Sequence, residues 1–151
     1  MTSETIKLKT LELDDFEDVF EWRKNLITRK MFRYTGRVDR NKFYDIFVNY
    51  LNDLSFIALY NDNKIGFIRL ENMHRGTYEI SINVNPKYRG KGYGKRILNK
   101  LLEKKINGVD LIFSSIKKNN IPSIKLFLSC GFQEITTSDT AEYREFNYRF
   151  A

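Results

Sequence analysis

Three closely spaced glycines carry the clearest chemical signal in the sequence. They occupy positions 90, 92 and 94 of the segment Arg89-Gly-Lys-Gly-Tyr-Gly94, between a predicted strand and a predicted helix. In such a turn several backbone N–H groups converge on one anion, and the positive end of the helix dipole faces the same point. The segment is therefore predicted to bind a phosphate group. The alternative is a tight turn that only reverses the chain.

The spacing of the glycines excludes two common nucleotide-binding motifs. A dinucleotide-binding turn has G-x-G-x-x-G after the first strand, with an acidic residue about 20 positions later. A nucleoside-triphosphate loop has G-x-x-x-x-G-K-[ST]. Here the glycines run G-x-G-x-G, deep in the chain, so neither motif is present.

The elements that flank the glycines are defined by a change of hydrophobic period. Ile80, Ile82 and Val84 alternate with polar residues as a strand requires, and Pro86 ends the strand. After Gly94 the apolar side chains follow one helical face: Ile97, Leu98, Leu101, Leu102 and Ile106. The next apolar run, 110–116, completes a strand–helix–strand crossover, so strands 77–84 and 110–116 are predicted to be parallel.

The other predicted elements give a mixed α/β (α+β) fold. A strand at 6–11 precedes a helix capped by Asp14 or Asp15, a short helical stretch at 26–31 and a helix at 39–52. Further predicted elements are a hairpin of strands 55–60 and 64–70, a helix from Asn120 to Gly131, and a closing hairpin of strands 133–137 and 141–150. We expect a twisted, mostly antiparallel sheet of about seven strands with helices on both faces.

Bulk properties bound the class of protein. The chain has 151 residues and a net charge of +7, without an apolar run of about 18 residues, so we expect one soluble, cytoplasmic domain spanning 1–151. The basic residues are spread along the chain, which suits a polyanionic cofactor or substrate, and nucleic-acid binding is the alternative. A single cysteine, Cys130, and a single histidine, His74, predict neither a disulfide nor a metal site.

Two segments resemble the GNAT superfamily of acetyl-CoA-dependent N-acetyltransferases. Arg89 to Gly94 is similar to the signature [QR]-x-x-G-x-[GA], and Asn120 to Phe132 is similar to N-x-x-[AS]-x-x-L-[YF]-x-x-x-G-F. The resemblance covers residues 54–150 closely and the N-terminal part in outline. It implies direct transfer of an acetyl group from acetyl-CoA to a primary amine, with no metal and no covalent enzyme intermediate.

The resemblance also assigns cofactor contacts. In this superfamily the central parallel strands splay apart, and their unpaired backbone groups bind the pantetheine arm and the acetyl oxygen. The residues expected to contact acetyl-CoA are Ile82, Val84, Arg89, Gly90, Lys91, Gly92, Gly94, Lys95, Asn120 and Ser123.

Proton transfer is where the sequence departs from the family. The tyrosine that many members use to protonate the leaving thiolate is replaced by Phe127. Ser123, one turn earlier, is the candidate donor, and Tyr93 and Tyr143 are less well placed. Alternatively, the thiolate leaves unassisted and takes its proton from solvent. Glu79 is the candidate base, and its alternative role is that of a cross-strand partner for a Lys or Arg.

The acceptor pocket is expected in the N-terminal half. Residues 21–25 and 29–32 resemble segments of bacterial GNAT enzymes that acetylate nucleotide-linked amino sugars, which implies Trp22, Arg23, Arg29 and Tyr34 as substrate contacts. We expect a small-molecule amine acceptor, no nucleic-acid or membrane partner, and a monomer or homodimer. The other acceptors still open are N-terminal amines of ribosomal or other proteins, small amines and antibiotics. A non-catalytic acetyl-CoA-binding module is a further alternative.

Overall fold

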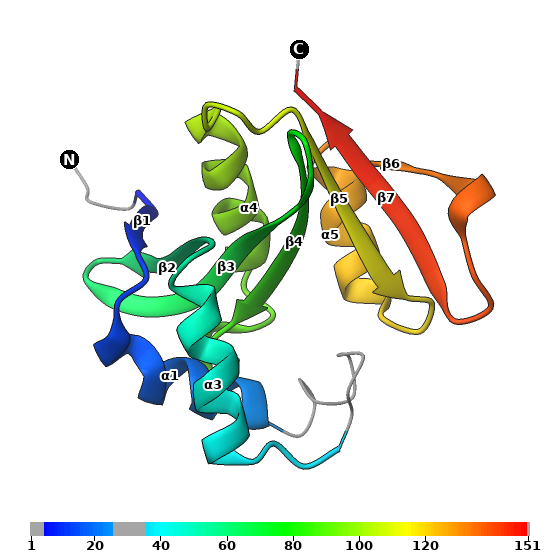
Figure 1. Ribbon diagram of the computed structural model, residues 1–151. Coiled ribbons are helices and arrows are strands. Elements are labelled where there is room, and N and C mark those ends of the chain that lie inside the picture. Colours follow the sequence, from blue (N-terminus) through cyan, green and yellow to red (C-terminus); the bar gives the residue numbers. More distant parts are fainter. Residues whose placement is uncertain (1–4, 26–35, 151) are drawn as a thin grey trace.

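A computed structural model describes residues 5–25 and 36–150 of the chain (Figure 1). Seven strands form one sheet in the order β1-β2-β3-β4-β5-β7-β6. The strands are β1 (Lys7–Thr10), β2 (Leu54–Tyr60), β3 (Asn63–His74), β4 (Thr77–Val84), β5 (Leu111–Lys117), β6 (Gln133–Glu134) and β7 (Tyr143–Arg149). The α-helices are α1 (Phe16–Lys24), α3 (Arg40–Tyr50), α4 (Tyr93–Lys104) and α5 (Ile121–Ser129). The predicted fold class is confirmed.

Local sequence explains most of these boundaries. Asn61 and Asp62 adopt positive φ angles of 49° and 65° in the β2–β3 turn, which Asn and Asp tolerate better than most residues. The side chain of Asp39 caps α3 by accepting a hydrogen bond from Asn41 N. Helix α4 ends earlier than the Asn107-Gly108 pair suggested, because Lys105 already takes the left-handed conformation that stops it. The predicted stretch 26–31 lies outside the described residues.

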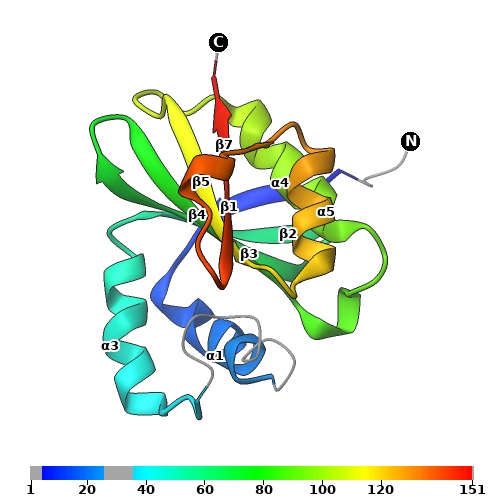
Figure 2. The same ribbon diagram turned by 90° about the vertical axis from the view of Figure 1, so that its right-hand side faces the viewer.

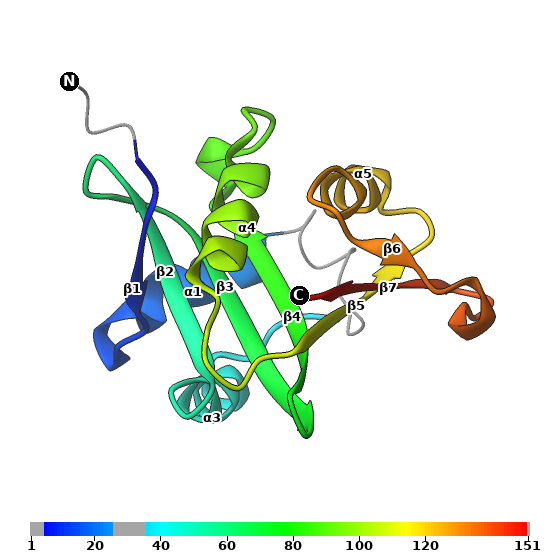
Figure 3. The ribbon, with the colours of Figure 1, turned by 90° about the horizontal axis from the view of Figure 1, so that it is seen from above.

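Helices cover both faces of the sheet (Figures 2 and 3). Helices α4 and α5 pack on one face through a large apolar cluster that includes Ile97, Leu101 and Phe127. Helices α1 and α3 pack on the other face through a smaller, aromatic-rich cluster that includes Phe16 and Phe47. None of the helices within the described ranges has the length and apolarity that crossing a membrane requires.

Strands β4 and β5 are the only neighbours within the described sheet that run parallel, and they separate along their length. Their register contains three pairs, of which the last is Glu79↔Phe113. Each strand keeps its outer antiparallel partner far beyond that point, β4 with β3 and β5 with β7. Figure 1 shows the two arrows diverging as a V. The sheet therefore opens at its centre, while β4 stays paired with β3 and β5 stays paired with β7.

Ion pairs of the acidic segment before α1 connect β1 to the hairpin of β2 and β3. Asp15 was expected as a helix cap, and it does occupy the N-cap position of α1, but its side chain makes no cap hydrogen bond. Its buried carboxylate instead accepts from Lys9 Nζ at 2.7 Å and from Lys64 Nζ at 2.8 Å. The network links β1, α1 and the start of β3, and so fixes where α1 lies on the sheet.

Candidate active site

The glycine loop leaves space for an anion at the start of α4. Gly90 and Gly92 have positive φ angles of 75° and 82°, and a Cβ added at either position would meet no atom within 4 Å. Their glycine identity is therefore explained by backbone conformation and by the open space beside it. The first N–H groups of a helix have no partner within the helix, and in α4 the earliest bond runs from Arg96 N to Gly92 O at 3.4 Å. The geometry fits the expected pyrophosphate.

Gly94 has a different role from the two glycines before it. A Cβ at position 94 would lie 3.3 Å from Leu126 Cδ2 on α5 and 3.6 Å from a methyl carbon of Val84 on β4. Glycine here lets α4 approach the neighbouring helix and strand closely. Lys91 and Lys95, also expected at the pyrophosphate, lie exposed on the same loop and first turn.

The side chain of Arg89 does not point along the glycine loop. Its Nε donates to Val84 O at 3.1 Å, and its two terminal nitrogens donate to Asn83 Oδ1 at 2.8 Å and to Asn25 Oδ1 at 3.4 Å. Burial lowers the pKa of this guanidinium from its usual value. The fork of donors is thus turned toward β4 and the end of α1, and a contact between Arg89 and the pyrophosphate stays a prediction.

Backbone groups of β4 face the central opening as expected. Asn85 N donates to Ile65 O, and hydrogen bonding alternates along an antiparallel pair. This alternation directs the N–H and C=O groups of Ile80, Ile82 and Val84 away from β3 and toward β5. The Val84 carbonyl already accepts from Arg89, so Ile82 is the better placed of the two residues predicted to bind the pantetheine arm.

A cavity of about 1100 Å³ runs through this opening. Its walls include Gly90, Gly92, Gly94 and Lys95 at one end, and Asn120, Ser123 and Phe127 along α5. On the far face of the sheet it is lined by Glu79, Ser81 and Asn83 of β4, together with Arg23 of α1 and Arg69 of β3. One continuous space therefore joins the phosphate loop to the face of the sheet that α1 and α3 cover.

Helix α5 contributes a polar first turn and an apolar second turn to the cavity wall. Asn120 caps the helix, because its Oδ1 accepts from Ser123 N at 3.3 Å. Ser123 is partly exposed and lines the cavity, whereas Phe127, one turn later, is buried and packs edge-on against Phe132 at 4.9 Å. Ser123 is thus a hydroxyl that the first turn of α5 presents to the cavity, whereas the Ser129 hydroxyl, also on the wall, donates to Leu126 O at 2.7 Å.

Glu79 lies on the face of the sheet that α1 and α3 cover, where the acceptor is expected. Its direct neighbour across β3 is Glu71, and Phe113 is its partner on β5. Arg69, two positions from Glu71, forms an ion pair with Asp53 at 2.9 Å and a longer one with Glu71 at 3.4 Å. The residue directly opposite Glu79 is thus Glu71, Arg69 lies at the next pair on the same face, and the role of Glu79 as base stays a prediction.

The residues predicted to contact the acceptor differ in where the structure places them. Trp22 is buried in the aromatic-rich cluster and is not among the residues of the cavity wall, so the structure does not bring it together with the other predicted substrate contact that it describes, Arg23. Arg23, only 9% exposed, does line the cavity. Arg29 and Tyr34 lie outside the described residues.

The structure adds wall residues that sequence reasoning missed. Tyr50 stacks on Phe67 with ring centroids 5.5 Å apart, and the Arg69 guanidinium lies 4.3 Å from the Tyr50 centroid. Burial raises the pKa of the Tyr50 hydroxyl, so it stays protonated at neutral pH. Asn83 also lines the cavity, and so does Tyr143, which the sequence offered only as a less well placed proton donor. Period-2 alternation already places Asn83 on the same face of the strand as Glu79, but no contact with a ligand was predicted for it.

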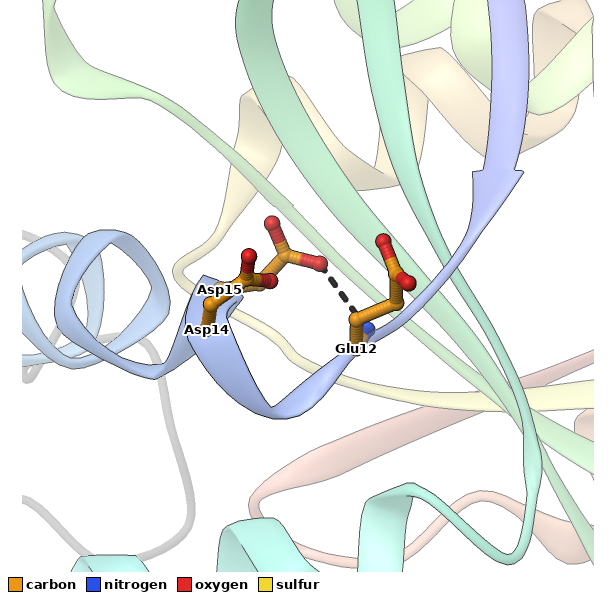
Figure 4. A group of neighbouring side chains, drawn as sticks. All are labelled: Glu12, Asp14 and Asp15. Carbon is orange, nitrogen blue, oxygen red and sulfur yellow. Dashed lines mark hydrogen bonds between the residues drawn. The ribbon is translucent and has the colours of Figure 1, made fainter.

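A group of acidic side chains near the N-terminus lies away from the cavity. Within the described ranges, Glu12, Asp14 and Asp15 form the one set of three close enough to share an ion (Figure 4). Both oxygens of Asp15 already accept from lysine ammonium groups, and Oδ2 also accepts from Glu12 N at 2.9 Å. The ammonium groups of Lys9 and Lys64 therefore compensate the negative charge of Asp15.

Comparison with known proteins agrees with this geometry. The model of the Acetyltransferase (GNAT) family matches residues 14–132. N-alpha-acetyltransferase RimI of Mycobacterium tuberculosis is 34% identical over 71 residues, which cover 46% of this chain and 44% of that protein. The uncharacterized N-acetyltransferase YfmK of Bacillus subtilis is 29% identical over 135 residues, covering 89% of this chain and 87% of that protein. The match spans less than half of the length of the first two curated relatives.

A solved structure supports the fold. Spermidine N-acetyltransferase from Vibrio cholerae, in complex with CoA and spermine, superposes with a TM-score of 0.82 at 17% identity, covering 98% of this chain and 96% of that one. The fold, the glycine loop at the start of α4 and the family match over most of the chain lead to one conclusion. The chain belongs to the GNAT family of acetyl-CoA-dependent acetyltransferases.

Proposed function

We propose that the chain transfers the acetyl group of acetyl-CoA to a primary amine carried by a nucleotide-linked amino sugar. The observation that carries the proposal is the continuous cavity, which joins the open space beside Gly90 and Gly92 to a face lined by Glu79 and two arginines. Such a cavity brings a donor and an acceptor to the same opening from opposite faces of the sheet.

The donor half would hold acetyl-CoA through backbone groups. The pyrophosphate would bind the N–H groups that begin α4, with Lys91 and Lys95 adding positive charge. The pantetheine arm would follow the edge of β4 at Ile82, with Asn120 and Ser123 on the opposite wall. Positioning of this kind accounts for much of the catalytic effect, because transfer then needs only an aligned amine.

The chemistry follows from the groups at the acceptor face. Glu79 would accept a proton from the acceptor ammonium, and the neutral nitrogen would attack the thioester carbon as the C–S bond breaks. The nitrogen gives up two protons in all. The first passes through Glu79 to solvent, and the second goes to the thiolate. Ser123 is the candidate to donate a hydrogen bond to the departing sulfur, since Phe127 has no proton to give.

The acceptor class is supported by two arginines on the wall of the acceptor half and by the net charge of the chain. Arg23 and Arg69 place two guanidinium groups beside the Tyr50–Phe67 stack, and arginine suits phosphate and carboxylate recognition. A net charge of +7 favours an anionic acceptor over a polyamine by long-range attraction.

A thiol-release assay with acetyl-CoA and a panel of amines tests the proposal. The panel would contain a UDP-linked 4-amino sugar, a peptide with a free N-terminus, and spermidine. We expect the nucleotide sugar to give the highest kcat/KM, by at least about tenfold, a factor that corresponds to roughly 1.4 kcal/mol. A preference for the peptide would overturn the acceptor class. Failure of every amine in the panel to cause thiol release would overturn the proposed catalysis.

A further inference from the structure

A buried side-chain amide lies at the acceptor face of the cavity. Asn83 lies on β4, is 7% exposed, and lines the cavity four residues after Glu79. Buried polar side chains are normally hydrogen-bonded, so an amide that reaches a ligand cavity needs an explanation. The partners of Asn83 supply it.

Arg89 fixes which end of the Asn83 amide faces the cavity. An arginine can only donate hydrogen bonds, so the atom that receives its terminal nitrogen at 2.8 Å must be the carbonyl oxygen Oδ1. The amide nitrogen Nδ2 is then a donor on the opposite side. Arg89 is itself held by Val84 O at 3.1 Å and Asn25 Oδ1 at 3.4 Å, so the amide orientation is set by three segments of the chain.

We propose that Asn83 is a specificity-determining residue whose amide nitrogen donates a hydrogen bond to an oxygen of the acceptor, and that Arg89 is the positioning residue that orients it. The inference rests on the proposed function, because it concerns the acceptor half of the same cavity. It assigns Arg89 to acceptor recognition, although this residue begins the phosphate loop.

Strand geometry adds a requirement on the acceptor. Glu79 and Asn83 lie on the same face of β4, separated by four residues or about 13 Å between Cα atoms. An acceptor whose amine lies at Glu79 therefore needs an oxygen several ångströms away to reach Asn83. Nucleotide-linked sugars carry sugar and phosphate oxygens at such distances, whereas short monoamines do not.

The test compares a long and a short form of one acceptor. The pair is the UDP-linked 4-amino sugar and the methyl glycoside of the same amino sugar, or, if the panel favours a peptide, a tetrapeptide and the amide of its first residue. The variant is Asn83→Asp, which keeps the size of the side chain and gives Arg89 a carboxylate partner, but has no donor to offer. Its matched control is Asn72→Asp on the exposed end of β3, outside the cavity.

We expect Asn83→Asp to lower kcat/KM for the long acceptor by about 10- to 100-fold, mostly through KM, and to change that of the short acceptor by less than about threefold. CoA affinity, measured by calorimetry, should stay within about twofold, and Asn72→Asp should match the wild type throughout. Wild-type selectivity in Asn83→Asp, or an equal loss with both acceptors, would show that Asn83 is only a structural anchor for Arg89.

A second variant tests the positioning role. Arg89→Lys keeps the positive charge but replaces the planar fork by one ammonium group, which does not reproduce the three oriented contacts. We expect the same loss of preference for the long acceptor, while Arg40→Lys, at an exposed arginine remote from the cavity, behaves as wild type. Full preference retained in Arg89→Lys would overturn the positioning role. These outcomes are ratios between variants, so they are distinct from a wild type that prefers the wrong amine, which would count against the proposed function alone.

Discussion

At the scale of single residues, the proposed mechanism depends on how the acceptor amine becomes a nucleophile. An amine is mostly protonated at neutral pH, and only its neutral form attacks a thioester. Glu79 lies on the cavity wall at the end of the β4–β5 register, where an acceptor ammonium would meet it.

We therefore expect Glu79→Gln to lower kcat by about 10²- to 10³-fold at neutral pH, in line with usual acid–base contributions. The low-pH limb of the rate profile should flatten, because the carboxyl group whose protonation stops the reaction is gone. Steady-state kinetics across pH measure both effects, with Glu103→Gln on the exposed side of α4 as control. Near-wild-type turnover with an unchanged profile would remove Glu79 from the mechanism.

Variants of Ser123 and Phe127 test whether the leaving thiolate needs a proton donor. A thiolate with a pKa near that of cysteine can leave before it is protonated, so loss of the Ser123 hydroxyl should cost less than loss of Glu79. We expect Ser123→Ala to lower kcat by roughly tenfold or less, and Phe127→Tyr to retain activity. Single-turnover rates for the two variants would measure this order. A larger loss in Ser123→Ala than in Glu79→Gln would reverse the assignment of acid and base.

At the scale of elements, the loop between β4 and α4 is the part that the cofactor should need most. Gly92→Val adds a side chain where the backbone must approach phosphate, and forces valine into a positive φ angle of 82°. Gly108, with a φ of 87° and equally open surroundings, lies after the opposite end of α4 and away from the cavity. The pair separates backbone strain from ligand contact.

Both Gly92→Val and Gly108→Val should lose about 1–2 kcal/mol of stability from strain at a positive φ angle. Only Gly92→Val should also lose CoA affinity, by at least about tenfold, a factor that corresponds to roughly 1.4 kcal/mol. Thermal melts and calorimetry measure the two effects. Unchanged CoA affinity in Gly92→Val would refute the phosphate cradle.

The ion-pair network that anchors α1 gives a pH-dependent stability. Burial alone would raise the pKa of Asp15, but hydrogen bonds from Lys64 and Lys9 outweigh it, so the pKa lies below its usual value. A carboxyl group with a lowered pKa stabilises the fold fully above about pH 4, and this contribution is lost as the pH falls through the folded-state pKa.

Asp15→Asn should therefore lower the free energy of unfolding by about 2–3 kcal/mol at pH 7, since it leaves two lysines without their carboxylate. Urea titrations at pH 7 and pH 3 should show a smaller difference from wild type at pH 3. Asp14→Asn, at the exposed neighbouring carboxylate, should change stability little at either pH. An Asp15→Asn deficit that is the same at both pH values would contradict the linkage.

At the scale of the whole molecule, local patterns predicted the sheet well because each strand and helix carries its own period. The parallel pair followed from the crossover rule, and the glycine loop from its spacing. The place of β7 between β5 and β6 did not follow, because a closing hairpin contains no local signal for which of its strands meets β5.

Side-chain direction within the site was the least predictable feature. The sequence placed Arg89 in a phosphate loop, yet its guanidinium turns back to Asn83 and Asn25, which lie 6 and 64 positions away in sequence. Trp22 was predicted as a substrate contact, and the structure instead buries it in a cluster built from α1, α3 and the sheet. Contacts between distant segments determine such directions, and one sequence does not record them.

The central claim is that CoA binds along the opening between β4 and β5, with its pyrophosphate at the start of α4. Amide hydrogen exchange of the protein with and without CoA tests it most directly, because the claim names the N–H groups that become bonded. We predict slower exchange in residues 80–95 and 120–124 when CoA is added, and unchanged exchange in β1 and β2. Binding of CoA without slower exchange in residues 90–95 would contradict the account.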